Sequence, residues 1–169
     1  MKTTVTPNAE KVVTYGQVAI RLGYTNIAKR DDIDSMIASA QSFAEQELNA
    51  TLLTSTATAT AYDNEKIYLN KGPVQAIVSV TLDGIPNTSW QLKTYGTLDE
   101  LIINSGYRVA TIVYTVGYGD SNLAVPQTIV DCIMAHTIER FKNPGVIDEK
   151  TLTQLRNFYR LNSRHTVVG

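Results

Sequence analysis

Cysteine and histidine are scarce in this sequence, and their scarcity limits the chemistry that the chain can perform. The single cysteine, Cys132, excludes a disulfide framework and a metal site made of several cysteines. The two histidines, His136 and His165, stand 29 positions apart and have no obvious co-ligand. Because a zinc site needs several such side chains together, we expect neither a metal site nor a bound cofactor.

Long apolar runs are also missing. None approaches the roughly 20 residues that a membrane-spanning helix requires, and the opening MKTTVTPNAEK has no apolar middle like that of a secretory signal. Hydrophobic residues nevertheless make up 43% of the 169 residues, which is enough for a packed core. We therefore expect a soluble protein that is made in a reducing compartment and does not bind membranes.

Charge is distributed unevenly along the chain. The formal net charge is −1, which excludes a generally basic, polyanion-binding protein, yet residues 140–169 carry a net +4 and the rest −5. Three arginines in this basic segment, Arg156, Arg160 and Arg164, recur every four residues, so they share one face of a predicted helix. Two interpretations stay open: a solvated helix face, or a surface that contacts phosphates or carboxylates.

Apolar spacing of three and four residues predicts helices near the start of the sequence. A short one covers residues 14–22 and ends at Gly23. A longer one follows in RDDIDSMIASAQSFAEQELNATLL, with Asp31 or Asp32 at its N-cap. The acids there suit the positive end of the helix dipole, so we interpret them as a helix start and not as metal ligands.

The segment TSTATATAY alternates hydroxyl and alanine residues, which predicts a strand. Its side chains are small on both faces, so we expect it to pack closely against another element or to pair at a sheet edge. Further strands are predicted in EKIYLNKGPVQAIVSVTLDG, SWQLK, ELIIN and RVATIVYTV. Together they make residues 54–116 an antiparallel β-meander.

The last third returns to a helical period. Pro126 suits the first turn of a helix, Asn143-Pro144-Gly145 ends that helix, and Asp148 caps another. We predict an α+β fold: a small α-helical bundle, made of the N-terminal helix plus two C-terminal helices, with an inserted antiparallel β-meander. We expect one domain over residues 1–169, with a loose arm at 1–12, helices at 13–53, strands at 54–116, helices at 126–162 and a tail at 163–169.

The segment GYGD at residues 117–120 raises the question of a phosphate-binding loop. A P-loop needs a lysine after its last glycine, and a dinucleotide loop needs a third glycine that opens a helix. Neither is present here, and the next helix begins only near Pro126. We interpret GYGD as a strand exit followed by a glycine turn.

A catalytic pair is the other chemistry that the sequence could offer. Cys132 and His136 are four residues apart and share one helix face. A catalytic dyad also needs an orienting third group and a cleft, and Cys132 flanks an apolar stripe, as a small buried residue would. We therefore rank a small hydrolase last among the candidate functions and expect no enzymatic activity.

Three segments, in order, resemble the head–tail connector, or adaptor, family of tailed bacteriophages. The helix DIDSMIASAQSFAEQELNATLL is similar to the family's alanine-containing first helix. The family's characteristic hairpin is similar to the segment IYLNKGPVQAIVSVTLDG. Its glycine–proline segment is similar to VATIVYTVGYGDSNLAVPQTIVDCIMAHTIERF. The residues that carry the resemblance are Leu69, Pro73, Val74, Ile77, Val80, Asp83, Gly84, Tyr114, Gly117, Tyr118, Val125, Pro126 and Ile133. The match spans residues 31–142; the Thr/Ala strand and the arginine-rich end have no counterpart in the pattern.

The resemblance implies a structural virion protein at the head–tail interface, made in the cytoplasm of the bacterial host. Members form a homo-oligomeric ring of about twelve subunits under the portal protein. The ring extends the channel for the passing double-stranded DNA and receives the next neck or tail protein, such as a stopper. The alternative is another neck or tail assembly protein, a head-closure stopper or a tail completion protein, although these are mainly β.

Two groups of residues become candidate contact sites under this interpretation. Arg156, Arg160 and Arg164 are candidates for contact with channel DNA or with an acidic portal surface. Thr56, Thr58 and Thr60 are candidates for a strand at the subunit interface, because a ring can cover sheet edges with neighbouring copies.

Overall fold

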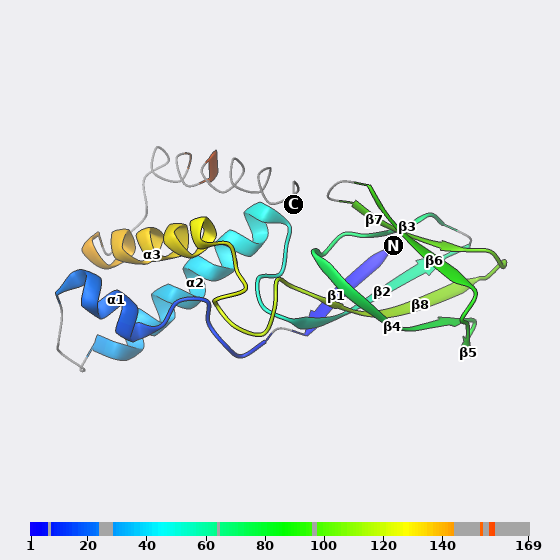
Figure 1. Cartoon of the computed structure of the whole chain (residues 1–169), viewed down its shortest axis with the longest axis horizontal. Coiled ribbons are helices and arrows are strands. Elements are labelled where there is room, and N and C mark those ends of the chain that lie inside the picture. Colours follow the sequence, from blue (N-terminus) through cyan, green and yellow to red (C-terminus); the bar gives the residue numbers. More distant parts are fainter. Residues whose placement is uncertain are drawn as a thin grey trace. The chain divides into compact units, whose positions relative to one another are not determined.

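The computed structural model describes residues 1–6, 8–23, 29–63, 65–95 and 98–143, together with Thr153, Arg156 and Asn157. Strands and helices lie in two compact units, each assembled from two separate stretches of the chain (Figure 1). Unit 1, Met1–Ala9 and Asn49–Asp120, holds the strands, and unit 2, Glu10–Leu48 and Ser121–Gly169, holds the helices. The predicted α+β class is confirmed.

Unit 1 contains a five-stranded antiparallel sheet. Its strands, in spatial order, are β1 (Lys2–Thr6), β2 (Ser55–Tyr62), β8 (Val109–Val116), β4 (Val74–Leu82) and β5 (Ile85–Pro86). The predicted strands are present and antiparallel. Their order is not that of a simple meander, however, because β8 lies between β2 and β4.

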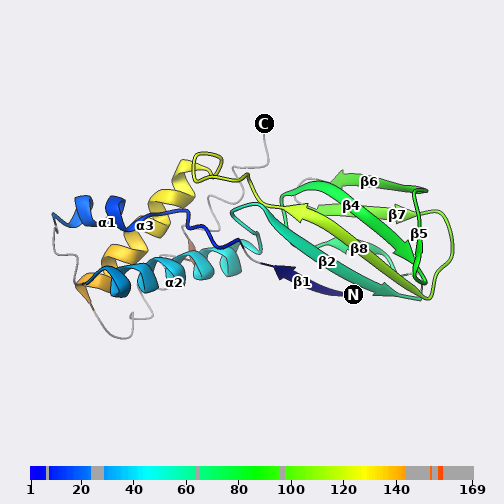
Figure 2. The same cartoon turned by 90° about the horizontal axis from the view of Figure 1, so that it is seen from below.

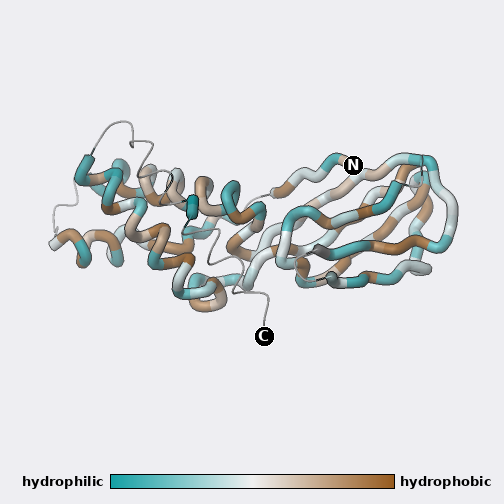
Figure 3. Tube along the Cα trace, turned by 90° about the horizontal axis from the view of Figure 1, so that it is seen from above, coloured by the Kyte–Doolittle hydropathy of each residue, from teal (hydrophilic) through white to brown (hydrophobic). Residues whose placement is uncertain are grey.

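A second, three-stranded antiparallel sheet has the order β3 (Ile67–Leu69), β7 (Leu98–Ile103) and β6 (Trp90–Tyr95). Residues of both sheets contribute to one buried cluster, including Ile67, Leu101 and Ile112. Residue hydropathy changes repeatedly along the strands, as expected where one face of each sheet is buried (Figure 3). Unit 1 is therefore a two-layered β structure with its own core.

The first residues form β1, so the prediction of a loose arm at residues 1–12 is wrong. β1 pairs with β2 over all five of its residues, from Lys2 opposite Thr60 to Thr6 opposite Thr56. Four of the five are β-branched, which favours a strand. Asn8 holds the end of β1 in place, since its Nδ2 donates to the Thr54 carbonyl at 3.1 Å.

The alternating segment forms β2, and its alanines explain how the two layers of unit 1 meet. Ala57, Ala59 and Ala61 are fully buried, whereas the threonines between them face outward. Because alanine ends at Cβ, the opposing sheet can approach closely. Of the two expectations for this segment, close packing is therefore confirmed, and pairing at a sheet edge is wrong because β2 lies between β1 and β8.

Unit 2 contains α1 (Tyr15–Leu22), α2 (Arg30–Leu48) and α3 (Gln127–Lys142). Thr14 caps α1 in a reciprocal pair with Gln17, and Gly23 ends it in the left-handed conformation at φ 63°. α2 begins at Arg30, so Asp31 and Asp32 lie inside the helix and the prediction that either is its N-cap is wrong. Both carboxylates still lie in the first turn, where the helix dipole favours them.

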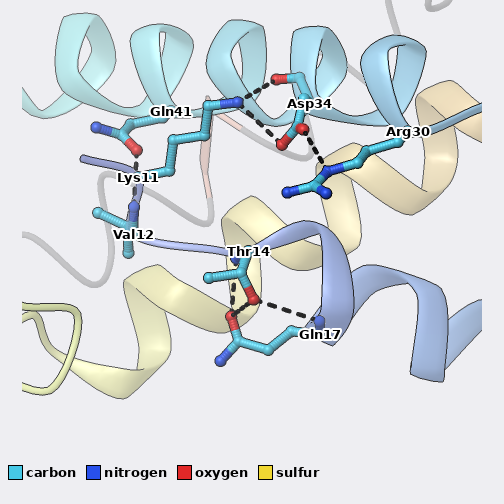
Figure 4. Close-up of polar contacts among 7 residues, drawn as sticks. All are labelled: Lys11, Val12, Thr14, Gln17, Arg30, Asp34 and Gln41. Atoms are coloured by element: carbon cyan, nitrogen blue, oxygen red, sulfur yellow. Dashed lines mark hydrogen bonds and ion pairs between the residues drawn. The ribbon is translucent and has the colours of Figure 1, made fainter. Parts of the chain in front are cut away.

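α2 and α3 pack against each other through apolar faces at helical spacing. α2 buries Ile33, Ile37, Ala40 and Ala44, and the buried residues of α3 include Ile129 and Ile133. The segment before α1 is tied to α2 by polar contacts (Figure 4). Lys11 Nζ lies 3.0 Å from Asp34 Oδ1, and the Val12 amide donates to Gln41 Oε1 at 2.9 Å.

The last predicted helix has little described structure. Thr153, Arg156 and Asn157 are helical. The predicted cap at Asp148, the end of the helix at 162 and the tail at 163–169 lie outside the described residues.

Candidate functional site

The predicted interface residues Thr56, Thr58 and Thr60 lie together on the outer face of the five-stranded sheet. They alternate with the buried alanines of β2, so their side chains are directed away from the core. β1 and β8 occupy both hydrogen-bonding edges of β2. A neighbouring molecule could therefore meet these threonines through the sheet face, but not through the main chain of β2.

The registers place further small, uncharged side chains beside them. Thr58 stands in a row with Thr4, Val113 and Ser79, and Thr56 in a row with Thr6, Thr115 and Ala76. A third row contains Thr60, Thr111 and Thr81. We call these residues the threonine face: Thr4, Thr6, Thr56, Thr58, Thr60, Ala76, Ser79, Thr81, Thr111, Val113 and Thr115.

The threonine face carries no charge of its own, and Lys2 extends only its third row. Its side chains are exposed or half-buried. Depletion of charge distinguishes the centre of protein–protein interfaces from the rest of a surface, and threonine offers a methyl group and a hydroxyl without the desolvation cost of an ion. A face without cations is poorly suited to bind DNA phosphates. Its chemistry favours contact with another protein surface.

Sequence reasoning found the threonines of β2 but missed those of the neighbouring strands. Part of the signal was present, since Thr4 and Thr6 of KTTVT and Thr111 and Thr115 of VATIVYTV are an even number of residues apart, as residues on one face of a strand are. Nothing local shows, however, that β1 and β8 flank β2.

The GYGD segment forms part of the packing of unit 1, and its amides already have partners. The Gly117 amide donates to the Pro73 carbonyl at 2.9 Å, and the Tyr118 amide donates to the Leu52 carbonyl at 3.0 Å. Two amides that a phosphate loop would direct at its anion are therefore occupied. This geometry agrees with a strand exit and a glycine turn.

Cys132 and His136 both lie on α3 and are buried, with 4% and 1% of their surfaces exposed. Burial, with a smaller effect of Asp131, raises the pKa of the Cys132 thiol to about 12, so the reactive thiolate is strongly disfavoured. Burial, with a smaller effect of Arg140, lowers the pKa of His136 to about 4. His136 packs edge-on against Phe43 of α2, with 5.1 Å between ring centroids. The two side chains are therefore packed as core residues.

Of the predicted arginine stripe, the structure describes Arg156. Its Nε lies 3.1 Å from Oε1 of Glu47 at the end of α2, so this guanidinium already has a carboxylate partner in its own chain. Arg160 and Arg164 lie outside the described residues. Contact of the stripe with DNA or portal stays a prediction.

The same described residues offer neither a cluster of metal ligands nor a membrane-spanning helix. They contain no group of three or more histidine, cysteine or acidic side chains placed to hold a metal ion. None of their helices is long and apolar enough to cross a bilayer.

Several residues that carry the family resemblance have structural roles. The Asp83 carboxylate accepts the Val109 amide at 2.8 Å and both Asp83 and Gly84 have positive φ, so this pair makes the tight turn after β4. Tyr114 is fully buried in the core of unit 1, and Pro126 is the residue before the first turn of α3. The pattern thus reflects the fold more than any reactive site.

Comparison with known proteins gives structural neighbours only. No protein-family model and no curated protein sequence matches the chain. A chain from the neck of the empty gene transfer agent (GTA) particle, solved with C6 symmetry, superposes with a TM-score of 0.74 at 12% identity, over 94% of this chain and 95% of that one. This protein has the fold of a GTA neck chain.

Two related structures agree. A chain of the native GTA virion gives a TM-score of 0.69 at 14% identity, over 94% of this chain and 95% of that one. A chain from the neck of the native particle, solved with C12 symmetry, gives 0.62 at 14% identity, over 92% and 94%. The coverage includes both units, so the likeness concerns the whole architecture. The resemblance to phage connectors is confirmed at the level of fold.

Proposed function

We propose that this protein is a structural subunit of a phage-type neck, a head–tail connector or adaptor, located in the virion at the head–tail interface. The observation that carries the proposal is the superposition on a GTA neck chain over almost the full length of both chains. A fold shared end to end supports a shared structural role better than a shared local motif would.

The proposed assembly is a ring, with about twelve copies of the chain. The neck structures with which the chain shares its fold were solved with C6 and C12 symmetry. In our proposal the ring docks under the portal protein, extends the channel for double-stranded DNA and receives the next neck or tail protein. The uncharged threonine face supplies a contact surface for another subunit or a neighbouring ring.

The proposed role involves no catalysis. Cys132 and His136 form the one candidate catalytic pair in the sequence. Burial disfavours the thiolate form of Cys132 and the imidazolium form of His136. We expect native Cys132 to react with a thiol reagent at least about 100-fold more slowly than the unfolded chain. Stopped-flow labelling in buffer and in denaturant measures this ratio, and equal rates would restore Cys132 as a candidate nucleophile.

The arginine segment is proposed to contact either the portal or the channel DNA. Changing Arg160 and Arg164 to alanine leaves the Arg156–Glu47 pair intact. If the segment docks on the portal, the variant loses portal capture while ring mass is unchanged. If it touches DNA instead, capture is unchanged and the salt-dependent DNA retention of the ring falls.

The ring itself is tested by light scattering and negative-stain images, with the chain alone and after mixing with its portal. A ring of about twelve copies with a central hole supports the connector role. Monomers in both samples would contradict it. A ring that binds the far side of a preassembled connector and not the portal would identify the protein as a stopper or tail completion protein.

A further inference from the structure

The inference rests on the proposed ring and concerns how its copies join. Subunits related by a rotation other than twofold must offer two different surfaces that fit each other. The two sheets of unit 1 end in four strand edges. Exposed edges are natural sites for pairing with another chain, and proteins usually protect the edges that should stay unpaired. An edge without such protection is therefore a candidate for pairing with a neighbouring copy.

Two of the four edges are protected. β3 contains only three residues, too few to template another strand. β4 is interrupted by register shifts between Val74 and Ala76 and between Ile77 and Ser79, and β5 covers its end at Thr81 and Leu82. Such bulges twist an edge away from a potential partner.

The other two edges have none of these protections within the described residues. β1 pairs with β2 without interruption over five residues, and β6 pairs with β7 without interruption over six. Neither contains proline, and each has a single lysine, Lys2 or Lys93. On the side away from β2 or β7, neither is paired with another strand of the described part of the chain. Both edges thus present a straight row of main-chain donors and acceptors.

β6 is also unusually exposed for a strand in a two-layered structure. Five of its six residues are exposed, and they include Leu92 and Tyr95, with 37% and 56% of their surfaces accessible. Leu92 stands opposite the buried Leu101 of β7, so it belongs to the core-facing side of the sheet yet lacks full cover. A strand added beside β6 would cover it.

The two open edges lie at opposite sides of unit 1. β1 is the first strand of the five-stranded sheet, and β4 and β5 end its other side. Only residues 87–89 separate β5 from β6, so β6 must start within about 13 Å of β5. Figure 2 shows β1 and β6 on opposite sides of the strands between them. Edges so placed let every copy use β1 toward one neighbour and β6 toward the other.

We propose that β1 of one copy pairs through its free edge with β6 of the next copy, so that the five-stranded sheet of one subunit continues into the three-stranded sheet of its neighbour. The occupant of each edge is a second copy of this chain. Main-chain hydrogen bonds supply the pairing, as in other cases of strand addition. Asn8 and the Met1 ammonium, 3.2 Å from Glu65 Oε2, fix both ends of β1 in its own subunit, so β1 is presented and not exchanged.

Disulfide trapping tests the pairing directly, because residues opposite each other on adjacent strands lie within disulfide distance. Single cysteines replace Lys2, Thr4 or Thr6 in one protein and Gln91, Leu92, Lys93 or Thr94 in another. The two proteins are mixed before assembly, and rings purified by mass are oxidised mildly. The wild-type chain, whose only cysteine is buried, serves as the background control.

We expect each β1 cysteine to form a disulfide-linked dimer with β6 cysteines at alternate positions, two residues apart. The dimer yield at these positions should be at least about tenfold higher than at the positions between them. A matched control pairs each β1 variant with Val78→Cys, which is 62% exposed on the bulged β4 and should not cross-link. Rings that form but give no such β1–β6 bands, or that cross-link β1 to β1, overturn the pairing and leave the connector role intact. If no ring forms with or without portal, both proposals fail.

Discussion

Gly117 shows at the scale of one residue why the GYG segment needs glycine. Its φ is 118°, and a Cβ at this position would lie 2.6 Å from the carbonyl carbon and oxygen of Leu53. We expect Gly117→Ala to destabilise the protein by at least about 2 kcal/mol, through strain and this backbone clash. Urea unfolding followed by circular dichroism measures the change.

Gly16 provides the matched control. It lies in α1, and a Cβ there would meet no atom within 4 Å. Gly16→Ala should stabilise the protein by up to about 1 kcal/mol, because alanine loses less entropy in a helix. If both substitutions have the same effect, the explanation given for Gly117 is wrong.

His136 should make stability depend on pH. Its pKa is lowered from 6.5 to about 4 by burial first and by Arg140 second, so the unfolded chain binds a proton at higher pH than the folded one. The free energy of unfolding therefore has its full value above pH 6.5, and it decreases as the pH falls from 6.5 toward 4. At pH 5 the free energy of unfolding should be lower than at pH 7 by about 1–2 kcal/mol from this group.

Urea unfolding at both pH values, compared with His136→Phe, isolates the histidine. The variant keeps an aromatic ring beside Phe43 but cannot titrate. It should lose most of this part of the pH dependence, and an unchanged difference between pH 5 and pH 7 would contradict the assignment.

At the scale of the element, β2 offers a contrast between its two faces. Ala59 is fully buried and Thr58 faces outward. We expect Ala59→Leu to cost about 1–3 kcal/mol by overpacking the space between the sheets, whereas Thr58→Val should change stability by less than about 0.5 kcal/mol. Thermal unfolding of both variants measures the contrast, and equal losses would mean that the faces are assigned wrongly.

The elements also show how far the sequence could lead. Local pattern identified every helix of the described residues and the strands from β2 to β8 except the two-residue β5, because periodicity and turn residues such as Asp83-Gly84 are local signals. It missed β1, whose KTTVT is short and is followed by polar residues. It could not place β8 between β2 and β4, since the partners of β2 and β8, from Tyr62 and Val109 to Ser55 and Val116, lie 47 to 61 positions apart in the chain.

The candidate site was predictable to the same extent. The threonines of β2 could be found from TSTATATAY alone, whereas their companions Thr4 and Thr115 come from strands whose neighbours only the fold reveals. The open edges β1 and β6 are a property of the sheet order and have no local signature.

At the scale of the whole molecule, unit 1 has its own core and should fold without unit 2. A test protein can be made that ends at Asp120 and has a flexible Gly/Ser linker of about ten residues in place of residues 10–48. It retains every strand. We expect a cooperative unfolding transition and dispersed amide signals in its NMR spectrum. A non-cooperative transition with collapsed signals would show that unit 1 depends on the helices.

Because each unit is assembled from two separated stretches, the chain cannot finish either unit early in its synthesis. β1 emerges from the ribosome about 50 residues before β2, which at roughly 5–20 residues per second is a delay of some 2–10 seconds. The delay between the synthesis of α2 and that of the end of α3 is about twice as long. Unit 1 is complete only when β8 has been made, and the contact between α2 and α3 only after residue 142. Both units therefore reach their final form late, within a few seconds of each other, and an unfinished chain presents neither of them to a partner.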